Sequence, residues 1–150
     1  MRFWRLTRAA YVTAPLSGQG AAIAGGRWNS PGVRIAYAST SRPLALLEML
    51  VHVTRETVPP DMTLVPIDIP DRWVAKPEAL PADWSDLPFS AGARNLGDNW
   101  VHQARSLALI VPSVVLPAER NVLINPAHPH LRRVRVLPPE PLAFDRRLLR

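Results

Sequence analysis

The distribution of proline constrains the fold more than any other feature of this sequence. The chain contains 17 prolines in 150 residues, which is about twice the usual share in soluble proteins. They are concentrated in residues 58–88 and 112–141. Because proline lacks a backbone donor and interrupts helices and central strands, these segments predict long ordered loops and edge strands and argue against a helical bundle.

Length and composition narrow the class of protein further. A chain of 150 residues is long enough for one ordinary domain, so we expect a single domain over residues 1–150. The absence of cysteine excludes a disulfide framework and a thiolate zinc site, and it favours a reducing compartment. The sequence shows neither a signal peptide nor an apolar run of ~20 residues, so we expect a cytoplasmic protein without a membrane partner.

Hydrophobic periodicity predicts a mixed fold in which strands dominate. Ser41 is a suitable N-cap for a helix over residues 41–57, and Asp98 is a suitable cap for a second helix running to Leu107. Residues 70–97 are expected to be mostly loop. Strands are expected at residues 2–7, 34–39, 63–69, 107–116, 121–125 and 133–137, which gives an α+β fold class.

Glu48 is the only charged residue between Pro43 and Val51. Apolar residues occupy nearly every other position of this helix, so we expect the helix to be largely buried. A carboxylate in such a place must be paired, hydrogen-bonded or protonated. Glu48 is therefore either a structural ion-pair partner, with His52 as the local candidate, or a functional acid.

The segment "GGRWNSPG", residues 25–32, places Arg27 on a turn. A solvated surface hairpin is the ordinary interpretation. The planar fork of an arginine also suits a pyrophosphate, an aromatic ring such as that of Tyr37 can stack on a flat heterocycle, and a carboxylate such as that of Glu48 can stabilise an oxocarbenium ion. Together these three residues suit a dinucleotide that is cleaved at a glycosidic bond.

Four segments in this order resemble the RES-domain toxins of bacterial toxin–antitoxin systems: residues 25–32, 34–39, 42–50 and 97–129, the last being the most specific. The resemblance implies an ADP-ribosyltransferase-like fold, with strands around a cleft and a few helices. It also implies a toxin that uses NAD+ as a substrate and holds no cofactor. Such a toxin cleaves the nicotinamide–ribose bond by hydrolysis, phosphorolysis or transfer to a protein, and its partner is an Xre-type helix-turn-helix antitoxin.

The resemblance assigns roles to individual residues. The arginine, glutamate and serine for which the family is named fall on Arg27, Glu48 and Ser113, with Tyr37 as the aromatic of the pocket. Arg27 is expected to bind a phosphate, Tyr37 to stack on or edge the nicotinamide, and Glu48 to stabilise the transition state. Ser113 is expected to bind substrate, although a hydroxyl bonded to nearby backbone is the alternative for a serine in an apolar strand.

Several neighbouring residues have ordinary interpretations. Trp28 is expected to pack beneath the turn that carries Arg27. Asn125 could line the pocket, although asparagine before proline is also a turn signal. His128 and His130 lack the cysteine or carboxylate neighbours that a metal site requires, so we expect no metal.

The net charge of +6 is also consistent with an alternative function, that of a nucleic-acid-acting toxin or a non-catalytic RNA-binding module. Proteins that bind phosphate backbones carry a concentrated stripe of lysine and arginine. Here Lys76 is the only lysine and the arginines are scattered outside residues 131–136 and 144–150. The composition therefore favours a small phosphate-bearing ligand, and we expect no direct nucleic-acid binding.

Overall fold

One mixed sheet organises the computed structural model, which describes residues 1–149. The strands of this part of the chain are β1 (Arg2–Arg8), β2 (Ala36–Ser39), β3 (Met62–Asp68), β4 (Val74–Ala75), β5 (Ala108–Pro112), β6 (Arg120–Ile124), β7 (Arg135–Val136) and β8 (Glu140–Pro141). Their order is β4-β5-β6-β2-β1-β3-β7, and β8 also pairs with β3. All pairs are antiparallel except β4 with β5.

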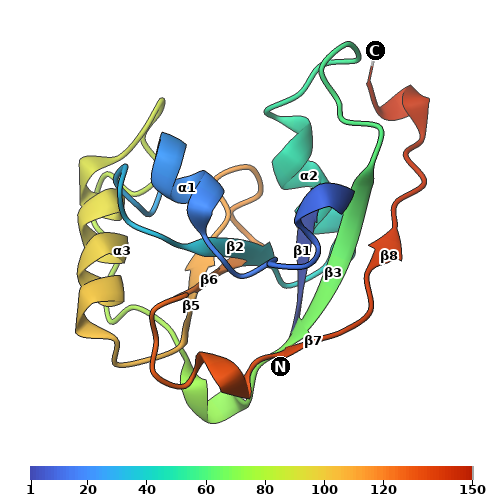
Figure 1. The fold of residues 1–150 in the computed structure, drawn as a ribbon. Coiled ribbons are helices and arrows are strands. Elements are labelled where there is room, and N and C mark those ends of the chain that lie inside the picture. The colour runs from blue at the N-terminus through green and yellow to red at the C-terminus, as the bar shows by residue number, and fades with distance from the viewer. Residues whose placement is uncertain (150) are drawn as a thin grey trace.

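Three α-helices accompany the sheet in the described residues: α1 (Gln19–Ala24), α2 (Arg42–Leu50) and α3 (Ala91–Gln103). Figure 1 shows α3 beside β5 and β6, whereas α2 lies over the half of the sheet that contains β1. The predicted α+β class is confirmed. None of these helices, within residues 1–149, combines the length and apolar character needed to cross a bilayer.

The helix boundaries confirm one predicted cap and correct the other. Ser41 caps α2, because its hydroxyl accepts a hydrogen bond from the Leu44 amide at 3.2 Å. Ser90, and not Asp98, caps α3, since its hydroxyl accepts from the Ala93 amide at 2.8 Å. The prediction of a loop was therefore wrong for residues 91–97. In this segment, which contains alanine and asparagine, the helical periodicity of apolar residues is weak.

Strand β2 separates two hydrophobic clusters through the alternation of its side chains. Ala36 and Ala38 face one cluster, whereas Ile35 and Tyr37 face the cluster that packs against α3. The first cluster contains Phe3, Ala36, Ala38, Val65, Ile67, Ile69, Leu107, Ala108, Ile110, Val122 and Ile124. The second contains Trp28, Ile35, Ala93, Trp100, Leu109, Val111 and Leu123.

Helix α2 is less buried than its apolar sequence predicted. Only Leu44 and Ala45 are buried within it, and Glu48 is half-buried. The expectation of a largely buried helix was wrong because one face of α2 borders a cavity. Ala45, Glu48 and Met49 all line that cavity.

Candidate active site

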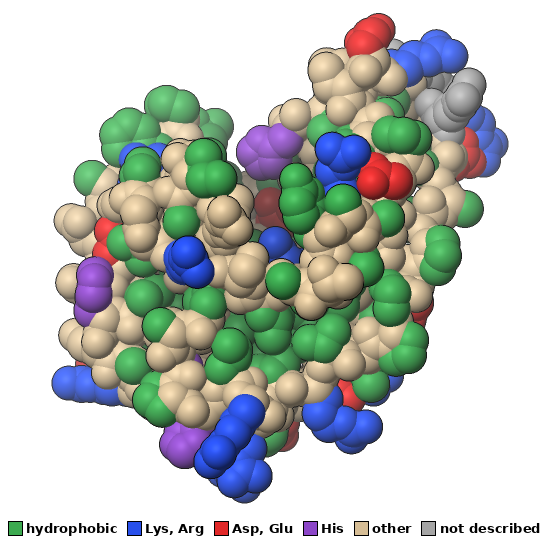
Figure 2. Space-filling view, viewed as in Figure 1, with side chains coloured by type: hydrophobic (Ala, Val, Ile, Leu, Met, Phe, Trp, Pro, Cys, Tyr) green, Lys and Arg blue, Asp and Glu red, His purple; other side chains and the backbone are tan. Residues whose placement is uncertain are grey.

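The cavity beside α2 has a volume of about 1070 Å³, at the upper end of the range for ligand pockets. Its walls come from β1, β2, α2, the turn that carries Arg27 and the end of the loop before α3. Figure 2 shows a hollow on this face, bordered by hydrophobic side chains and with acidic and basic side chains in its depth. The charged and aromatic lining includes Arg5, Arg27, Tyr37, Glu48, His52 and Arg94.

The turn at residues 25–29 holds Arg27 at the pocket wall. Gly25 has a φ of 72°, a left-handed conformation that glycine adopts without strain. The Asn29 side chain is fully buried, and its amide donates to the carbonyls of Ala21 and Val33, both at 2.9 Å. The tip of the turn is therefore fixed from inside, and Arg27 is part of a pocket instead of a solvated hairpin.

The Arg27 guanidinium is also tied to a distant loop. Its Nη1 donates to the carbonyls of Trp84, at 3.0 Å, and Asp86, at 2.8 Å. Its Nε and Nη2 have no hydrogen-bond partner among the described residues. One edge of the planar fork is thus used for positioning, and the other nitrogens are available to a ligand.

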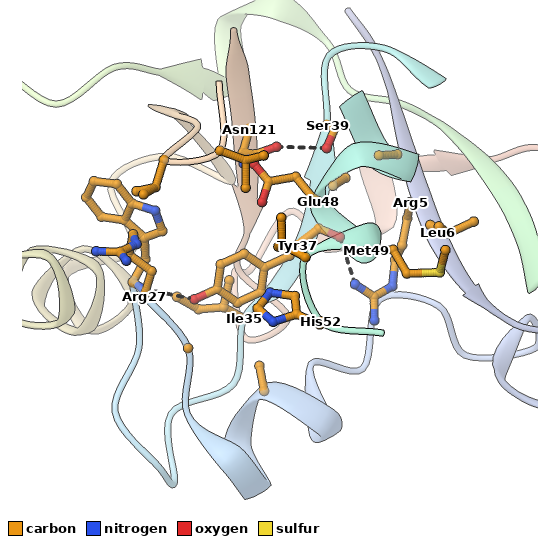
Figure 3. A pocket seen from close by; sticks show the side chains of 18 of the residues that line it. Arg5, Leu6, Arg27, Ile35, Tyr37, Ser39, Glu48, Met49, His52 and Asn121 are labelled. Atoms are coloured by element: carbon orange, nitrogen blue, oxygen red, sulfur yellow. Dashed lines mark hydrogen bonds between the residues drawn. The ribbon is translucent and has the colours of Figure 1, made fainter. Parts of the chain in front are cut away.

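Tyr37 contributes both its ring and its hydroxyl. The ring lines the pocket, and Figure 3 shows it between Arg27 and Arg5, below Glu48. The hydroxyl donates to Asn29 Oδ1 at 2.7 Å and accepts from the Trp28 amide at 3.1 Å. Burial raises the pKa of the Tyr37 phenol, so the hydroxyl keeps its proton and continues to donate to the turn.

Glu48 is held by hydrogen bonds instead of by an ion pair. Its Oε1 accepts from Ser113 Oγ at 2.6 Å and from Asn121 Nδ2 at 2.5 Å. Asn121 Oδ1 in turn accepts from Ser39 Oγ at 2.7 Å (Figure 3). Among the side chains that the structure describes, neither His52 nor an arginine pairs with Glu48, so the ion pair considered for Glu48 is not formed there.

Comparison with known proteins assigns the fold to a family. Residues 2–145 match the RES domain. The chain belongs to the RES-domain toxin family. One curated relative of this RES toxin is the Prs ADP-ribosylating toxin of Sphingobium sp. (strain YBL2), which is 41% identical over 155 residues, covering 99% of this chain and 96% of the relative. Another is Toxin Res of Photorhabdus laumondii, which is 40% identical over 128 residues, covering 84% and 82%.

A solved structure supports the fold of this RES toxin independently. The M. tuberculosis MbcT–MbcA toxin–antitoxin complex contains a chain that superposes with a TM-score of 0.75 at 18% identity, covering 95% of this chain and 84% of that one. This match confirms the predicted mixed fold of strands and few helices, whereas the family match and the two relatives confirm the resemblance to RES toxins.

The fold brings together the arginine, glutamate and serine for which the family is named, but only two of them line the pocket. Arg27 and Glu48 line the same pocket, whereas Ser113 is fully buried and lies behind Glu48. Ser113 Oγ accepts from the Leu116 amide at 2.9 Å while it donates to Glu48. The local backbone bond and the link to Glu48 thus coexist, and Ser113 lies outside the lining of the pocket.

Asn125 and the two histidines also lie outside the pocket lining. Asn125 is fully buried; its amide donates to the Val101 carbonyl, and its Oδ1 accepts from the Ala127 amide at 2.9 Å. His128 and His130 pack against the Trp73 ring, with ring centroids 5.5 and 4.2 Å away. Asn125 therefore occupies the turn that its Asn-Pro sequence also indicated.

Two residues of the site were missed from the sequence. Arg5 lines the pocket from β1, donates through Nη1 to the Tyr37 carbonyl at 2.7 Å, and has a buried Nε without a partner in the described residues. Burial lowers the pKa of this guanidinium. Along β1, Arg5 alternates with Phe3 and Thr7, which are both buried. This pattern in the sequence could have indicated that the charged side chain of Arg5 points inward. Asn121, the second donor to Glu48, carried no such signal.

Proposed function

We propose that this RES toxin is an enzyme that consumes NAD+ by cleaving its nicotinamide–ribose bond. One observation carries the proposal: a carboxylate fixed through a single oxygen shares a pocket with two arginines that have no carboxylate partner in the described residues. A ligand that complements this pocket carries anionic charge and develops positive charge near Glu48. NAD+ meets both requirements, because its pyrophosphate is anionic and its ribosyl carbon becomes cationic on cleavage.

The arginines account for the anionic part of the substrate. Arg27 lines the pocket, and its Nε and Nη2 have no hydrogen-bond partner in the described residues. An arginine fork binds phosphate oxygens with two parallel hydrogen bonds. Arg5 adds a second positive charge on the other side of the Tyr37 ring (Figure 3). Because a buried cation without a counter-charge destabilises the fold, binding of an anion near Arg5 is favourable.

Glu48 accounts for the bond cleavage. When the bond between C1′ of the ribose and the ring nitrogen breaks, its electron pair leaves with the ring, so nicotinamide departs neutral and needs no acid. The ribosyl group becomes oxocarbenium-like, and a carboxylate oriented in advance stabilises that charge. Ser113 and Asn121 hold Oε1 and leave Oε2 for the ribose, while the Tyr37 ring is in place to edge the nicotinamide.

The acceptor and the partner complete the proposal. Water, inorganic phosphate or a protein side chain can attack the same ribosyl carbon, and the name of the Sphingobium relative specifies ADP-ribosylation for that protein. The structural neighbour was solved with its antitoxin. We infer that an antitoxin, of the Xre helix-turn-helix type that the sequence resemblance implies, neutralises this chain.

Product analysis tests the proposed function. The chain is incubated with NAD+, with and without phosphate and with a candidate acceptor protein, and the products are identified by mass spectrometry. Free nicotinamide is expected in each arm that contains the acceptor used by the enzyme, accompanied by ADP-ribose, its 1″-phosphate, or a mass increase on the acceptor protein. NAD+ that stays intact in all arms would contradict the proposal.

A further inference from the structure

The loop that precedes α3 ends with exposed apolar side chains at the pocket wall. Leu87 and Phe89 are 77% and 50% exposed, and both line the pocket together with Pro88. A single exposed apolar side chain is ordinary on a protein surface. An aromatic ring on the wall of a pocket that also contains arginines is a potential contact for a planar ligand group.

The Phe89 ring is supported on one side by a cation. The Arg94 guanidinium carbon lies 4.6 Å from the centroid of the ring, within the distance of a cation–π contact. Arg94 belongs to α3, and its Nε donates to the Gly26 carbonyl at 3.0 Å. The cation is therefore anchored to the helix and to the Arg27 turn, while half of the Phe89 side chain stays accessible to a ligand.

The loop that carries Phe89 is held in place at several points. Arg27 Nη1 binds the carbonyls of Trp84 and Asp86, and Asp83 Oδ2 accepts from the Gly92 amide at 3.0 Å. Phe89 follows Asp86 by three residues. These hydrogen bonds fix the backbone on both sides of Phe89, and a loop that is already fixed loses less entropy when a ligand binds.

The contacts define an order of chemical groups along the pocket. Glu48 and Tyr37 both line the pocket, with Glu48 above the Tyr37 ring in the view of Figure 3. The Tyr37 hydroxyl contacts the turn that carries Arg27, and Arg27 contacts the loop that carries Phe89. A carboxylate, then a cation, then an aromatic ring is also the order required by a ribose, a pyrophosphate and a distal base.

We propose that Phe89, supported by Arg94, is the stacking platform for the adenine base of the dinucleotide. The inference rests on the proposed function, since it assigns the second half of the same substrate. Stacking contacts the face of a base and makes no hydrogen bonds to its edges. The site therefore accepts other purines in place of adenine with similar affinity.

Binding of ADP tests the inference without any turnover. ADP carries the base and the pyrophosphate but lacks nicotinamide, and inorganic pyrophosphate carries only the charges. Calorimetry is performed on the wild type and on Phe89→Ala, Phe89→Tyr and Leu80→Ala. Leu80 is an exposed apolar residue of the same loop that does not line the pocket, so it serves as the matched control.

Phe89→Ala is expected to weaken ADP binding by roughly tenfold, within the range for loss of one stacked base. Pyrophosphate binding is expected to stay at the wild-type level, and Phe89→Tyr and Leu80→Ala are expected to bind ADP normally. In turnover, Phe89→Ala raises KM for NAD+ and leaves the release of nicotinamide from nicotinamide mononucleotide unchanged, because that substrate lacks adenine.

Three results would overturn the inference: ADP binding that is absent in the wild type or unchanged in Phe89→Ala, an equal loss of pyrophosphate binding, or an equal loss with nicotinamide mononucleotide. The second result would mean that Phe89 only supports the loop bound by Arg27, and the third would place nicotinamide at Phe89. Failure of the proposed function is a separate observation, namely that the wild type leaves NAD+ intact.

Discussion

The Tyr37 hydroxyl connects the pocket to the turn that carries Arg27. Its ring lines the pocket, while its oxygen bonds to Asn29 Oδ1 and to the Trp28 amide. If Tyr37 acted only by stacking, Tyr37→Phe would keep much of that stacking because the ring is retained. The structure predicts a further loss, because removal of the hydroxyl leaves two largely buried polar groups without their partner.

Tyr37→Phe is expected to lower the free energy of unfolding by about 1–3 kcal/mol, the usual effect of unpairing buried polar groups. It is also expected to raise KM for NAD+, because the turn that positions Arg27 becomes looser. Denaturant unfolding and initial-rate kinetics measure the two effects. Tyr11→Phe is the control, since Tyr11 is 60% exposed and lies outside the pocket lining. Equal stability of the two variants would contradict the role of the hydroxyl.

At the scale of elements, α3 docks directly on the Arg27 turn. A Cβ on Gly97 would overlap the Trp28 carbonyl oxygen, and Asp98 Oδ1 accepts from the Ser30 amide at 2.9 Å. Residues 97–100, which read GDNW, therefore belong to the face of α3 that contacts the Arg27 turn. This contact explains why an aspartate with the features of an N-cap lies in the middle of the helix.

Gly97→Ala is expected to destabilise the protein by about 1–3 kcal/mol or more, as overpacking does, because α3 must move away from Trp28. Gly20→Ala in α1 is the matched control, since a Cβ at Gly20 meets no atom within 4 Å and alanine favours helix over glycine. Urea unfolding compares the two variants. A Gly97→Ala variant as stable as Gly20→Ala would contradict the proposed docking.

The sequence predicted the strands and the first cap well, because these depend on local patterns. The structure confirmed the Ser41 cap and a strand within residues 34–39. Contacts between distant segments were not predictable: Asn121 is 73 residues from Glu48, and Trp84 is 57 residues from Arg27. Their positions follow from the pairing of β2 with β6 and from the path of the proline-rich loop, which no local pattern encodes.

At the scale of the whole molecule, the described structure contains a buried group that limits stability in acid. His128 is 5% exposed and packs against Trp73. Burial, followed by the nearby His130, lowers the pKa of the His128 imidazole. The folded state therefore binds this proton less readily than the unfolded chain, so the stabilisation is present above the unfolded pKa and is lost as the pH falls through the folded pKa.

The free energy of unfolding is accordingly expected to decrease as the pH falls below about 6.5, the ordinary pKa of histidine. His128→Gln removes the titrating group and should flatten the profile between neutral pH and about pH 5. The hydrogen bond from Arg2 lowers the pKa of the Asp68 carboxylate. Its contribution to stability is therefore constant above its ordinary pKa of about 3.9 and decreases only below that pH. Parallel pH profiles for the wild type and His128→Gln would contradict the assignment.

Nicotinamide release by Glu48→Gln tests the central claim most directly. Glutamine keeps an oxygen that can accept from Ser113 and Asn121, so the melting temperature should stay close to that of the wild type. The negative charge is lost, and turnover per folded molecule is expected to fall by ~10²-fold or more, as when a preorganised electrostatic group is removed. A stably folded Glu48→Gln variant that releases nicotinamide from NAD+ at the wild-type rate would contradict the account.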